Sequence, residues 1–288
     1  MNPIKYIVEH ERDLLWGLSV CTVGFETIPP ESPYPSHKHG TGYYFSVEKG
    51  RVLHEYQLIY IPEGSGQLHT ASAGSCRLEA GSMFILFPGE WHTYHPDSSG
   101  GWKQYWIGFK GVNMDSRVQN NFLNRNHPVY NVGKNEEIVR LYHQAIDIAN
   151  CEEAYFQQML AGITNYLLGL MYSLDKNRQF NKDKEVVEQI NQARIYMREQ
   201  VENPISIQDI ATQTGMSYSH FRNKFKEFTG FSPAQYFQEI RLQRAKELLL
   251  TTALSVKEIA YKLHFDSPDY FSTRFKLKTG VKPGDIRK

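Results

Sequence analysis

The chain has 288 residues, 41% of them hydrophobic and 22% charged, which is the composition of a globular protein long enough for about two domains. No apolar run approaches the roughly 18 residues that cross a bilayer, and charges interrupt the opening MNPIKYIVEHERDLLWG, so we expect neither a membrane span nor a signal peptide. Three distant cysteines, Cys21, Cys76 and Cys151, fit neither a disulfide framework nor a metal knuckle. The expected location is therefore the cytoplasm.

The net charge of +1 conceals a basic C-terminal third. Residues 186–288 carry 16 Lys and Arg against 11 Asp and Glu, whereas residues 1–185 carry 16 against 20. A basic segment attached to an acidic body is typical of proteins that bind nucleic acid. Chance variation of the surface gives the same numbers, so charge alone leaves both interpretations open.

Residues 1–130 have the pattern of a β-rich domain. Short runs of β-branched and aromatic residues alternate with clusters of Gly, Pro and Ser. The candidate strands are YQLIYI (56–61), GQLHTA (66–71), SMFILF (82–87) and KQYWIGF (103–109), with turns at 62–66, 79–82, 88–90 and 96–101. Closely spaced short strands predict a sandwich or a barrel.

The apolar spacing changes to that of a helix from Glu136 onward. Apolar residues recur three or four positions apart, at Ile138, Leu141, Tyr142, Ala145 and Ile148. A second stretch has a wider apolar face, made by Tyr155, Phe156, Met159, Leu160, Ile163, Tyr166, Leu167 and Leu170. This face either packs on the β domain or forms the seam of a dimer, and we favour the seam. Residues 131–175 are thus predicted to be a helical dimerisation segment, and the polar residues 176–185 a linker.

Residues 186–288 contain an internal repeat. SIQDIATQTGMSYSHFRNKFKEFTGFSP (206–233) matches SVKEIAYKLHFDSPDYFSTRFKLKTGVKP (255–283) after an insertion of one residue. Each copy opens on a serine suited to a helix N-cap, Ser206 or Ser255, continues with a short helix that contains an Ile-Ala pair, and then begins a second helix. This order predicts two helix-turn-helix units.

The second helix of each copy has one apolar and one polar face. At about 100° per residue, the buried faces carry Phe221, Phe225 and Phe228 in the first copy, and Phe271 and Phe275 in the second. The opposite faces carry Ser219, Arg222, Asn223 and Lys226 in the first copy, and Asp269, Ser272, Thr273 and Lys276 in the second. Such a face is usually only solvated. Two matched polar faces in a basic segment also suit base edges in a major groove.

The C-terminal part of about a hundred residues resembles the AraC/XylS family of bacterial transcription regulators. The specific matches are RLQRAKELLL (241–250), between the two copies, and YFSTRFKLKTGVKPGDIRK (270–288). The resemblance implies an all-α DNA-binding domain whose two helix-turn-helix units enter successive major grooves on one face of DNA, about 34 Å apart.

The resemblance also assigns residues to DNA contacts. The bases would be read by Tyr218, Ser219, Arg222 and Asn223 of the first unit, and by Pro268, Asp269, Ser272 and Thr273 of the second. Arg222 is expected to discriminate most strongly, through a bidentate contact with guanine. Pro268 has no donor, so we expect the second helix to read fewer bases. The candidates for phosphate contacts, which position the protein without specifying a sequence, are Lys224, Lys226, Arg274 and Lys276.

Two residues depart from the family pattern. His264 stands where glycine is common, and Ile286 replaces an aromatic residue common near the C-terminus. Neither lies on a predicted reading face, so DNA binding is still expected. His264 predicts a strained turn or a shifted start of the following helix.

The N-terminal part resembles the cupin-type effector domain of the same family, through HKH (37–39), LEAGSMFILFPGEWHTYHPD (78–97) and GWKQYWIGFKG (101–111). The resemblance implies a small β-barrel with a ligand in its mouth. His37, His39 and His92 offer three imidazoles to a metal ion. The segment GTGYYFSV after the histidine pair lacks the usual cupin carboxylate. We therefore expect no metal or other cofactor.

A small organic effector is the favoured ligand. Trp102, Gln104 and Trp106 share one face of a strand by period two, so two rings and an amide point the same way. Rings beside polar groups suit a sugar, which has an apolar C–H face and a rim of hydroxyls. By the resemblance, the sugar-binding positions fall on Arg51, Tyr94, Gln104 and Trp106, and we add His37 and His39 at the barrel mouth. The alternative is an aromatic core strand.

These patterns predict a multidomain α and β protein that is a transcription regulator and not an enzyme. It has a cupin-like β-barrel at 1–130, a helical segment at 131–175, a linker at 176–185 and a double helix-turn-helix domain at 186–288. We expect an activator that forms a homodimer, binds double-stranded promoter DNA and RNA polymerase, and responds to a small molecule, a carbohydrate. Two alternatives stay open: a cupin metalloenzyme fused to a DNA-binding module, and an effector-independent regulator.

Overall fold

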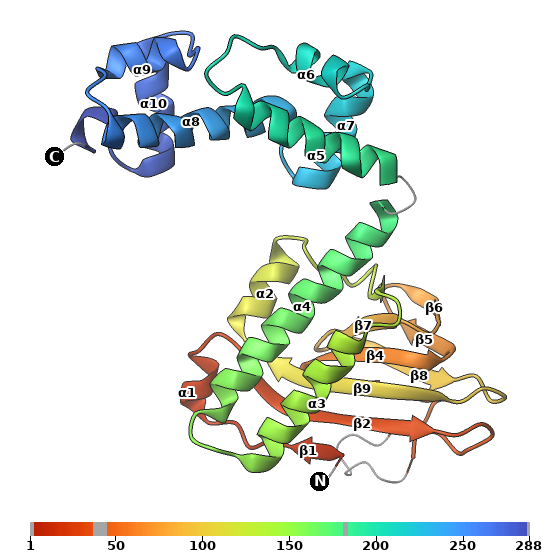
Figure 1. Cartoon of the computed structure of the whole chain (residues 1–288). Helices are drawn as coiled ribbons and strands as arrows, with labels where there is room; N and C mark the ends of the chain where they lie inside the picture. Colours follow the sequence, from red (N-terminus) through yellow and green to blue (C-terminus); the bar gives the residue numbers. More distant parts are fainter. Residues whose placement is uncertain (1–2, 37–44, 181–183, 287–288) are drawn as a thin grey trace. The chain divides into compact units, whose positions relative to one another are not determined.

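A computed structural model describes residues 3–36, 45–180 and 184–286. The chain forms two compact units, Met1–Gln179 and Phe180–Lys288 (Figure 1). The first unit is rich in β-strands and the second is built of helices. The predicted fold class, a β domain with helices followed by an all-α domain, is thereby confirmed.

Two antiparallel sheets form the first unit. One has six strands in the order β1-β2-β9-β4-β7-β10, and the other has four in the order β3-β8-β5-β6. The strands are β1 Ile4–Tyr6, β2 Ser19–Ile28, β3 Arg51–Val52, β4 Tyr56–Gly64, β5 Gly66–Thr70, β6 Gly74–Leu78, β7 Ser82–Leu86, β8 Trp91–Pro96, β9 Trp102–Lys110 and β10 Val129–Asn131. The four strands proposed from the sequence correspond to β4, β5, β7 and β9, so the short runs of β-branched and aromatic residues were read correctly.

Strand β9 shows how the larger sheet separates two hydrophobic cores. Trp102 and Trp106 belong to the core between the sheets, with Leu68 and Tyr94 of the smaller sheet. The alternate residues Tyr105, Ile107 and Phe109 belong to the core between the larger sheet and the helices. A strand with apolar side chains on both faces is buried on both sides, so β9 has a nearly continuous apolar sequence.

Helices cover the outer face of the larger sheet (Figure 1). They are α2 Val112–Gln119, α3 Glu136–Cys151 and α4 Phe156–Phe180, whereas the short α1 Glu11–Leu14 buries no residue. Ile138, Leu141 and Tyr142 of α3 are buried in the same core as Leu160 and Leu167 of α4. Packing on the sheet therefore accounts for most of the wide apolar face found in the sequence. In the described part of the chain, no helix has the length and apolar content that spanning a bilayer requires.

The expected linker at 176–185 is shorter in the structure. Helix α4 continues to Phe180, and the next helix begins at Lys184, so most of the segment is helical. Residues 181–183 lie outside the described residues. Lys176, Asn177 and Arg178 near the end of α4 are exposed, and an exposed helix end has no buried apolar face to give a periodic pattern.

The second unit contains six α-helices among its described residues. They are α5 Lys184–Glu199, α6 Ile207–Gln213, α7 Tyr218–Thr229, α8 Pro233–Thr251, α9 Val256–Lys262 and α10 Pro268–Thr279, followed by the 3-10 turn Pro283–Asp285. Two cores divide them. One joins α5, α6, α7 and the start of α8, and the other joins the rest of α8 to α9 and α10. Helix α8 thus connects two helix-turn-helix units, as the repeat predicted.

The repeat extends to individual hydrogen bonds. Ser206 and Asp209 form a reciprocal capping box at the start of α6, and Ser255 and Glu258 form the same box at α9. Helices α7 and α10 both have 12 residues and end at a left-handed glycine. Each of these details repeats because the same local sequence folds twice.

Candidate functional site

Helix α7 buries its aromatic face and exposes its polar one. Phe221 and Phe225 are fully buried against α5 and α6. Ser219, Arg222 and Asn223 are exposed, as the helical wheel predicts. The guanidinium of Arg222 lies 5.8 Å from the ring centroid of Tyr218, a cation–π contact that keeps two neighbouring side chains of the exposed face together.

Helix α10 presents a smaller polar face. Asp269 and Thr273 are exposed, whereas Pro268 and Ser272 are half-buried. The hydroxyls of Ser272 and Thr273 donate within the helix, to the carbonyls of Pro268 at 2.8 Å and Asp269 at 3.0 Å. With their protons used in this way, these hydroxyls have only lone pairs to offer a base. Helix α10 therefore exposes fewer free donors on this face than α7 does, and its reading of fewer bases stays a prediction.

The four candidate phosphate contacts differ in accessibility. Lys226 and Lys276 are exposed. Lys224 is half-buried, and its ammonium lies 3.1 Å from the carboxylate of Glu227. Arg274 is also half-buried. Lys226 and Lys276 are therefore better placed to meet a phosphate than the other two.

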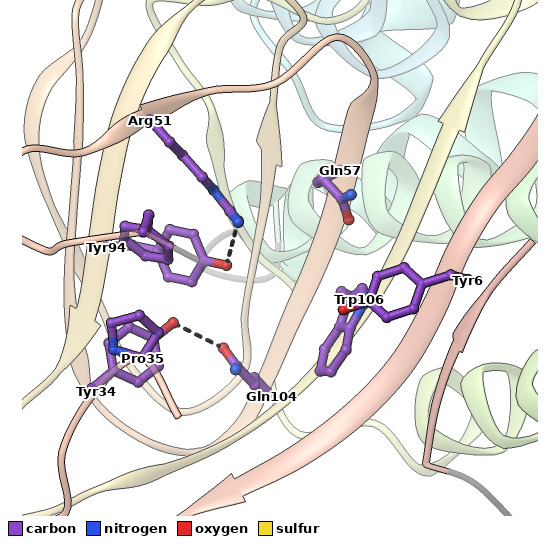
Figure 2. Close-up of a pocket in the computed structure, with 9 residues that line it drawn as sticks. Tyr6, Tyr34, Pro35, Arg51, Gln57, Tyr94, Gln104 and Trp106 are labelled. Carbon is purple, nitrogen blue, oxygen red and sulfur yellow. Dashed lines mark hydrogen bonds between the residues drawn. The ribbon is translucent and has the colours of Figure 1, made fainter. Parts of the chain in front are cut away.

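A pocket lies inside the β domain (Figure 2). Its lining is Tyr6, Tyr34, Pro35, Phe45, Arg51, Gln57, Tyr94, Gln104 and Trp106. The structure brings together Arg51, Tyr94, Gln104 and Trp106, four of the six side chains predicted to bind the effector. The other two, His37 and His39, lie outside the described residues.

Polar groups in this pocket face one another across aromatic rings. Arg51 donates from Nη2 to the hydroxyl of Tyr94 at 3.2 Å, and its guanidinium lies 4.5 Å from the ring centroid of Phe45. The hydroxyl of Tyr34 donates to Oε1 of Gln104 at 3.5 Å (Figure 2). Burial is the largest reason why the pKa of Tyr34 lies well above its usual value, so this hydroxyl keeps its proton.

His92 contacts Arg51 from the neighbouring strand β8. Its Nδ1 is 3.0 Å from the carbonyl of Glu90, and Nε of Arg51 is 3.3 Å from its Nε2. A carbonyl only accepts and a guanidinium only donates, so the proton is on Nδ1 and Nε2 is the acceptor. Burial, together with the positive charge of Arg51, lowers the pKa of His92 to about 4.

This arrangement does not suit a metal ion at His92. The imidazole nitrogen that would bind the ion already accepts a bond from a cation. A divalent ion there would be repelled by the guanidinium. Within residues 3–36, 45–180 and 184–286, no three His, Cys, Asp or Glu side chains are grouped to hold a metal.

Five pocket residues were missed by the sequence argument. They are Tyr6, Tyr34, Pro35, Phe45 and Gln57. Gln57 had a usable signal, because period two in YQLIYI places it on one face with Ile59 and Ile61, as the only polar member. Tyr34 precedes β3 in an irregular segment, where no periodicity points to a direction.

Comparison with known families covers both units. The AraC-like ligand-binding domain matches residues 32–162, which include all the described pocket residues except Tyr6. A helix-turn-helix domain matches residues 210–288, which include α7 and α10. The order of the two domains is the one that the sequence predicted.

Curated relatives extend over most of the chain. It is 27% identical over 249 residues to the raffinose operon transcriptional regulatory protein of Pediococcus pentosaceus, which covers 85% of this chain and 88% of the relative. It is 25% identical over 254 residues to the lactose operon transcription activator of Staphylococcus xylosus, covering 85% and 86%. It is 27% identical over 288 residues to an HTH-type transcriptional regulator of Escherichia coli, YidL, covering 100% and 93%.

The ligand-binding family thus matches the β domain that holds the pocket, and the helix-turn-helix family matches the helical domain that follows it. The chain belongs to the AraC family of DNA-binding transcriptional regulators.

Proposed function

We propose that this protein is a sugar-responsive activator whose helices α7 and α10 read promoter DNA. The observation that carries the proposal is the duplicated helix-turn-helix, in which two helices of equal length bury phenylalanines and expose polar faces. Short polar and cationic side chains on an exposed helix match the donors and acceptors of base edges in a major groove.

The two helices divide the work unequally. On α7, Tyr218, Ser219, Arg222 and Asn223 read bases, with Arg222 as the main determinant. On α10, Asp269 accepts from a cytosine amine, while Pro268, Ser272 and Thr273 contribute through shape and through lone pairs. Lys226 and Lys276 contact phosphates, and Lys224 and Arg274 assist only if their side chains extend from their half-buried positions.

The effector is a carbohydrate bound in the pocket of the β domain. Rings of Trp106 and Tyr94 offer apolar faces, and Arg51, Gln57 and Gln104 offer donors and acceptors. That combination fits a sugar ring with its hydroxyl rim. Two relatives are named for the raffinose and lactose operons, and these names support the same class of effector.

The pocket has to widen before it can hold a sugar. About 410 Å³ of space between the lining atoms is empty, counting the part that opens to solvent, but the cavity itself is about 20 Å³, room for one water molecule. The contacts that narrow it are the side-chain bonds Arg51–Tyr94 and Tyr34–Gln104. A sugar that replaces these bonds with its own hydroxyls selects the open arrangement, and its preference for that arrangement sets the strength of the response.

The active form is a homodimer joined through α4. Met159, Gly162, Tyr166 and Gly169 lie three or four positions apart on α4, and all four are exposed. At Gly162 and Gly169 an added Cβ would meet nothing within 4 Å, which leaves room for a second helix to approach closely. As an activator, the dimer contacts RNA polymerase at the promoter. The name of the Staphylococcus xylosus relative, an activator, supports this direction of control.

The first test is thermal unfolding of the full chain with a panel of monosaccharides and with raffinose and lactose. A sugar present at 100 times its dissociation constant adds about 2.7 kcal/mol to the stability of the unit that binds it. The matched variant is Gln104→Leu, which keeps the size of the side chain and removes its amide. A selective shift that Gln104→Leu abolishes supports the proposal. No shift with any sugar removes the carbohydrate effector and leaves DNA recognition as it stands.

A further inference from the structure

The loop between α5 and α6, which leads into the first helix-turn-helix unit, contacts helices of the second unit. The carboxylate of Glu202 lies 2.8 Å from Nε of Arg244 on α8 and 2.7 Å from the ammonium of Lys262 on α9. These two cations, Lys262 first, hold the pKa of Glu202 below its usual value. Val201, the preceding residue, is buried in the core of the second helix-turn-helix unit, among residues of α8, α9 and α10. The α5–α6 loop is thereby attached to α8 and α9, which carry the second helix-turn-helix unit.

His264 makes a third bond to the same loop. Its Nε2 lies 2.9 Å from the carbonyl oxygen of Glu202, so Nε2 carries the proton and donates. The equivalent position of the first unit is Gly215, and the two residues occupy the same left-handed backbone region, with φ of +72° at Gly215 and +54° at His264. The bond patterns around them also match, since the following residue in each unit donates to the carbonyl of Ala211 or Ala260 at 3.0 Å.

A histidine at this position costs conformational energy that a glycine avoids. The first helix-turn-helix unit has the glycine, Gly215. The second has His264, whose side chain donates to the carbonyl of Glu202, and glycine has no atom that could make this bond. The predicted strained turn at His264 is confirmed by its φ, and the bond to Glu202 gives it a physical reason.

We propose that Glu202 and His264 form a latch that fixes the spacing and rotation of α7 relative to α10. Helix α8 is the one stretch of chain that runs from the first helix-turn-helix unit to the second. A single helix can bend and twist, so by itself it does not fix how the two units are oriented. The latch adds a second attachment, from a loop that belongs to the first unit. Both residues are positioning residues, because they act on DNA recognition through the helices and need not touch DNA. The inference rests on the proposed reading of DNA by both helices.

The test measures how strictly the protein requires the spacing between its two DNA segments. A duplex is selected from random-sequence DNA with the full chain, and the two contacted segments are located by footprinting. A second duplex has one base pair inserted between the segments, which turns one groove by about 35° relative to the other. Affinities for both duplexes are measured for the wild type, Glu202→Gln and His264→Gly.

The wild type is expected to lose at least about tenfold in affinity on insertion, since a rigid pair of units cannot satisfy both segments. In Glu202→Gln and His264→Gly this loss should be smaller, by about threefold or more. The matched control is Glu247→Gln, which removes the other carboxylate at Arg244, 2.9 Å away within α8, and should keep the full loss. His264→Gly should unfold at about the same temperature as the wild type, because it removes both the unfavourable φ and the bond to Glu202.

Two results would overturn the latch. An equal loss on insertion in the wild type and both variants, with all proteins folded, removes it while DNA recognition stands. A loss that falls equally in Glu247→Gln removes it as well, because the effect would then come from Arg244 within one unit. If the wild type selects no DNA at all, the proposed function fails and this inference fails with it.

Discussion

The guanidinium of Arg51 donates to Nε2 of His92 at 3.3 Å, and the two residues are also paired in register between β3 and β8. Because Nδ1 of His92 is held by the carbonyl of Glu90, the imidazole presents a fixed lone pair to Arg51. The histidine that the sequence offered as a metal ligand therefore orients an arginine in the pocket. His92 thus orients a side chain that we propose to bind the effector, as residues behind a binding site orient the residues that contact the ligand.

Arg51→Lys should abolish stabilisation by the sugar that shifts the wild type. Lysine keeps the charge but lacks the planar fork, so it cannot bond His92 and Tyr94 together while lying over Phe45. Thermal unfolding with and without the sugar measures the effect. Arg77→Lys is the control, since Arg77 pairs with Asp97 away from the pocket lining. An unchanged sugar response in Arg51→Lys would remove Arg51 from the binding site.

The stability of the β domain should fall as pH decreases from about 6.5 to about 4. Folding lowers the pKa of His92 from the ordinary 6.5 to about 4. Between these two pH values His92 is therefore protonated in the unfolded chain and neutral in the folded one. The contribution of His92 to the free energy of unfolding is fully present above pH 6.5. Below pH 4 the free energy of unfolding is reduced by about 3 kcal/mol at most through this residue. Denaturant unfolding at several pH values measures the slope.

His92→Gln isolates this contribution. Glutamine does not titrate, and its Oε1 can still accept from Arg51. The variant should therefore lose the pH dependence between 6.5 and 4 while keeping a folded barrel at neutral pH. If wild type and His92→Gln show the same slope across this window, another group is responsible and His92 is not the proton-linked residue.

The sequence was most informative where a pattern repeats. Trp106 illustrates this, because period two placed it on the inward face of β9 beside Gln104, and it lines the pocket. The sequence argument treated a core residue and a pocket residue as alternatives for Trp106. The structure shows both, since Trp106 is 8% exposed, packs in the core between the sheets and lines the pocket. One face of a strand serves both purposes in a barrel this small.

Features that depend on distant contacts were not available from the sequence. Tyr34 enters the pocket from an irregular segment, and its bond to Gln104 spans 70 positions. His264 was recognisable as a departure from the pattern, but its partner Glu202 is 62 positions away. Arg274 was placed with the phosphate contacts by its charge, although its position on α10 leaves it half-buried. Charge and periodicity predict a face of a helix and do not predict what packs beside it.

Arg222→Ala should weaken specific DNA binding and relax the preference at one base position. A bidentate contact between arginine and guanine discriminates by about 1–3 kcal/mol, so affinity for the selected site should fall by roughly 5- to 150-fold. Selection from random DNA, repeated with the variant, shows which position is relaxed. Arg198→Ala is the control, because Arg198 is an exposed arginine of α5 outside both reading helices.

Lys276→Ala should behave differently from Arg222→Ala. A phosphate contact carries no sequence information, so the variant should bind all sequences more weakly and keep the same preferred site. The slope of log affinity against log salt should become less steep by about one. A changed sequence preference in Lys276→Ala, or an unchanged one in Arg222→Ala, would contradict the roles assigned to these residues.

Met159→Asp should convert the proposed dimer to a monomer without unfolding the β domain. Met159 is 52% exposed on α4, so the substitution removes little from the core, but in a dimer seam it buries a charge next to an apolar helix face. A loss of at least about 2 kcal/mol is typical of a central interface residue, which raises the dissociation constant about 30-fold or more. Sedimentation of the full chain measures it. Val112→Asp is the control, since Val112 is 67% exposed in the same unit but lies on α2. A dimer that survives Met159→Asp at the wild-type concentration would place the interface on another surface, and the exposed face of α4 would then be a solvated one.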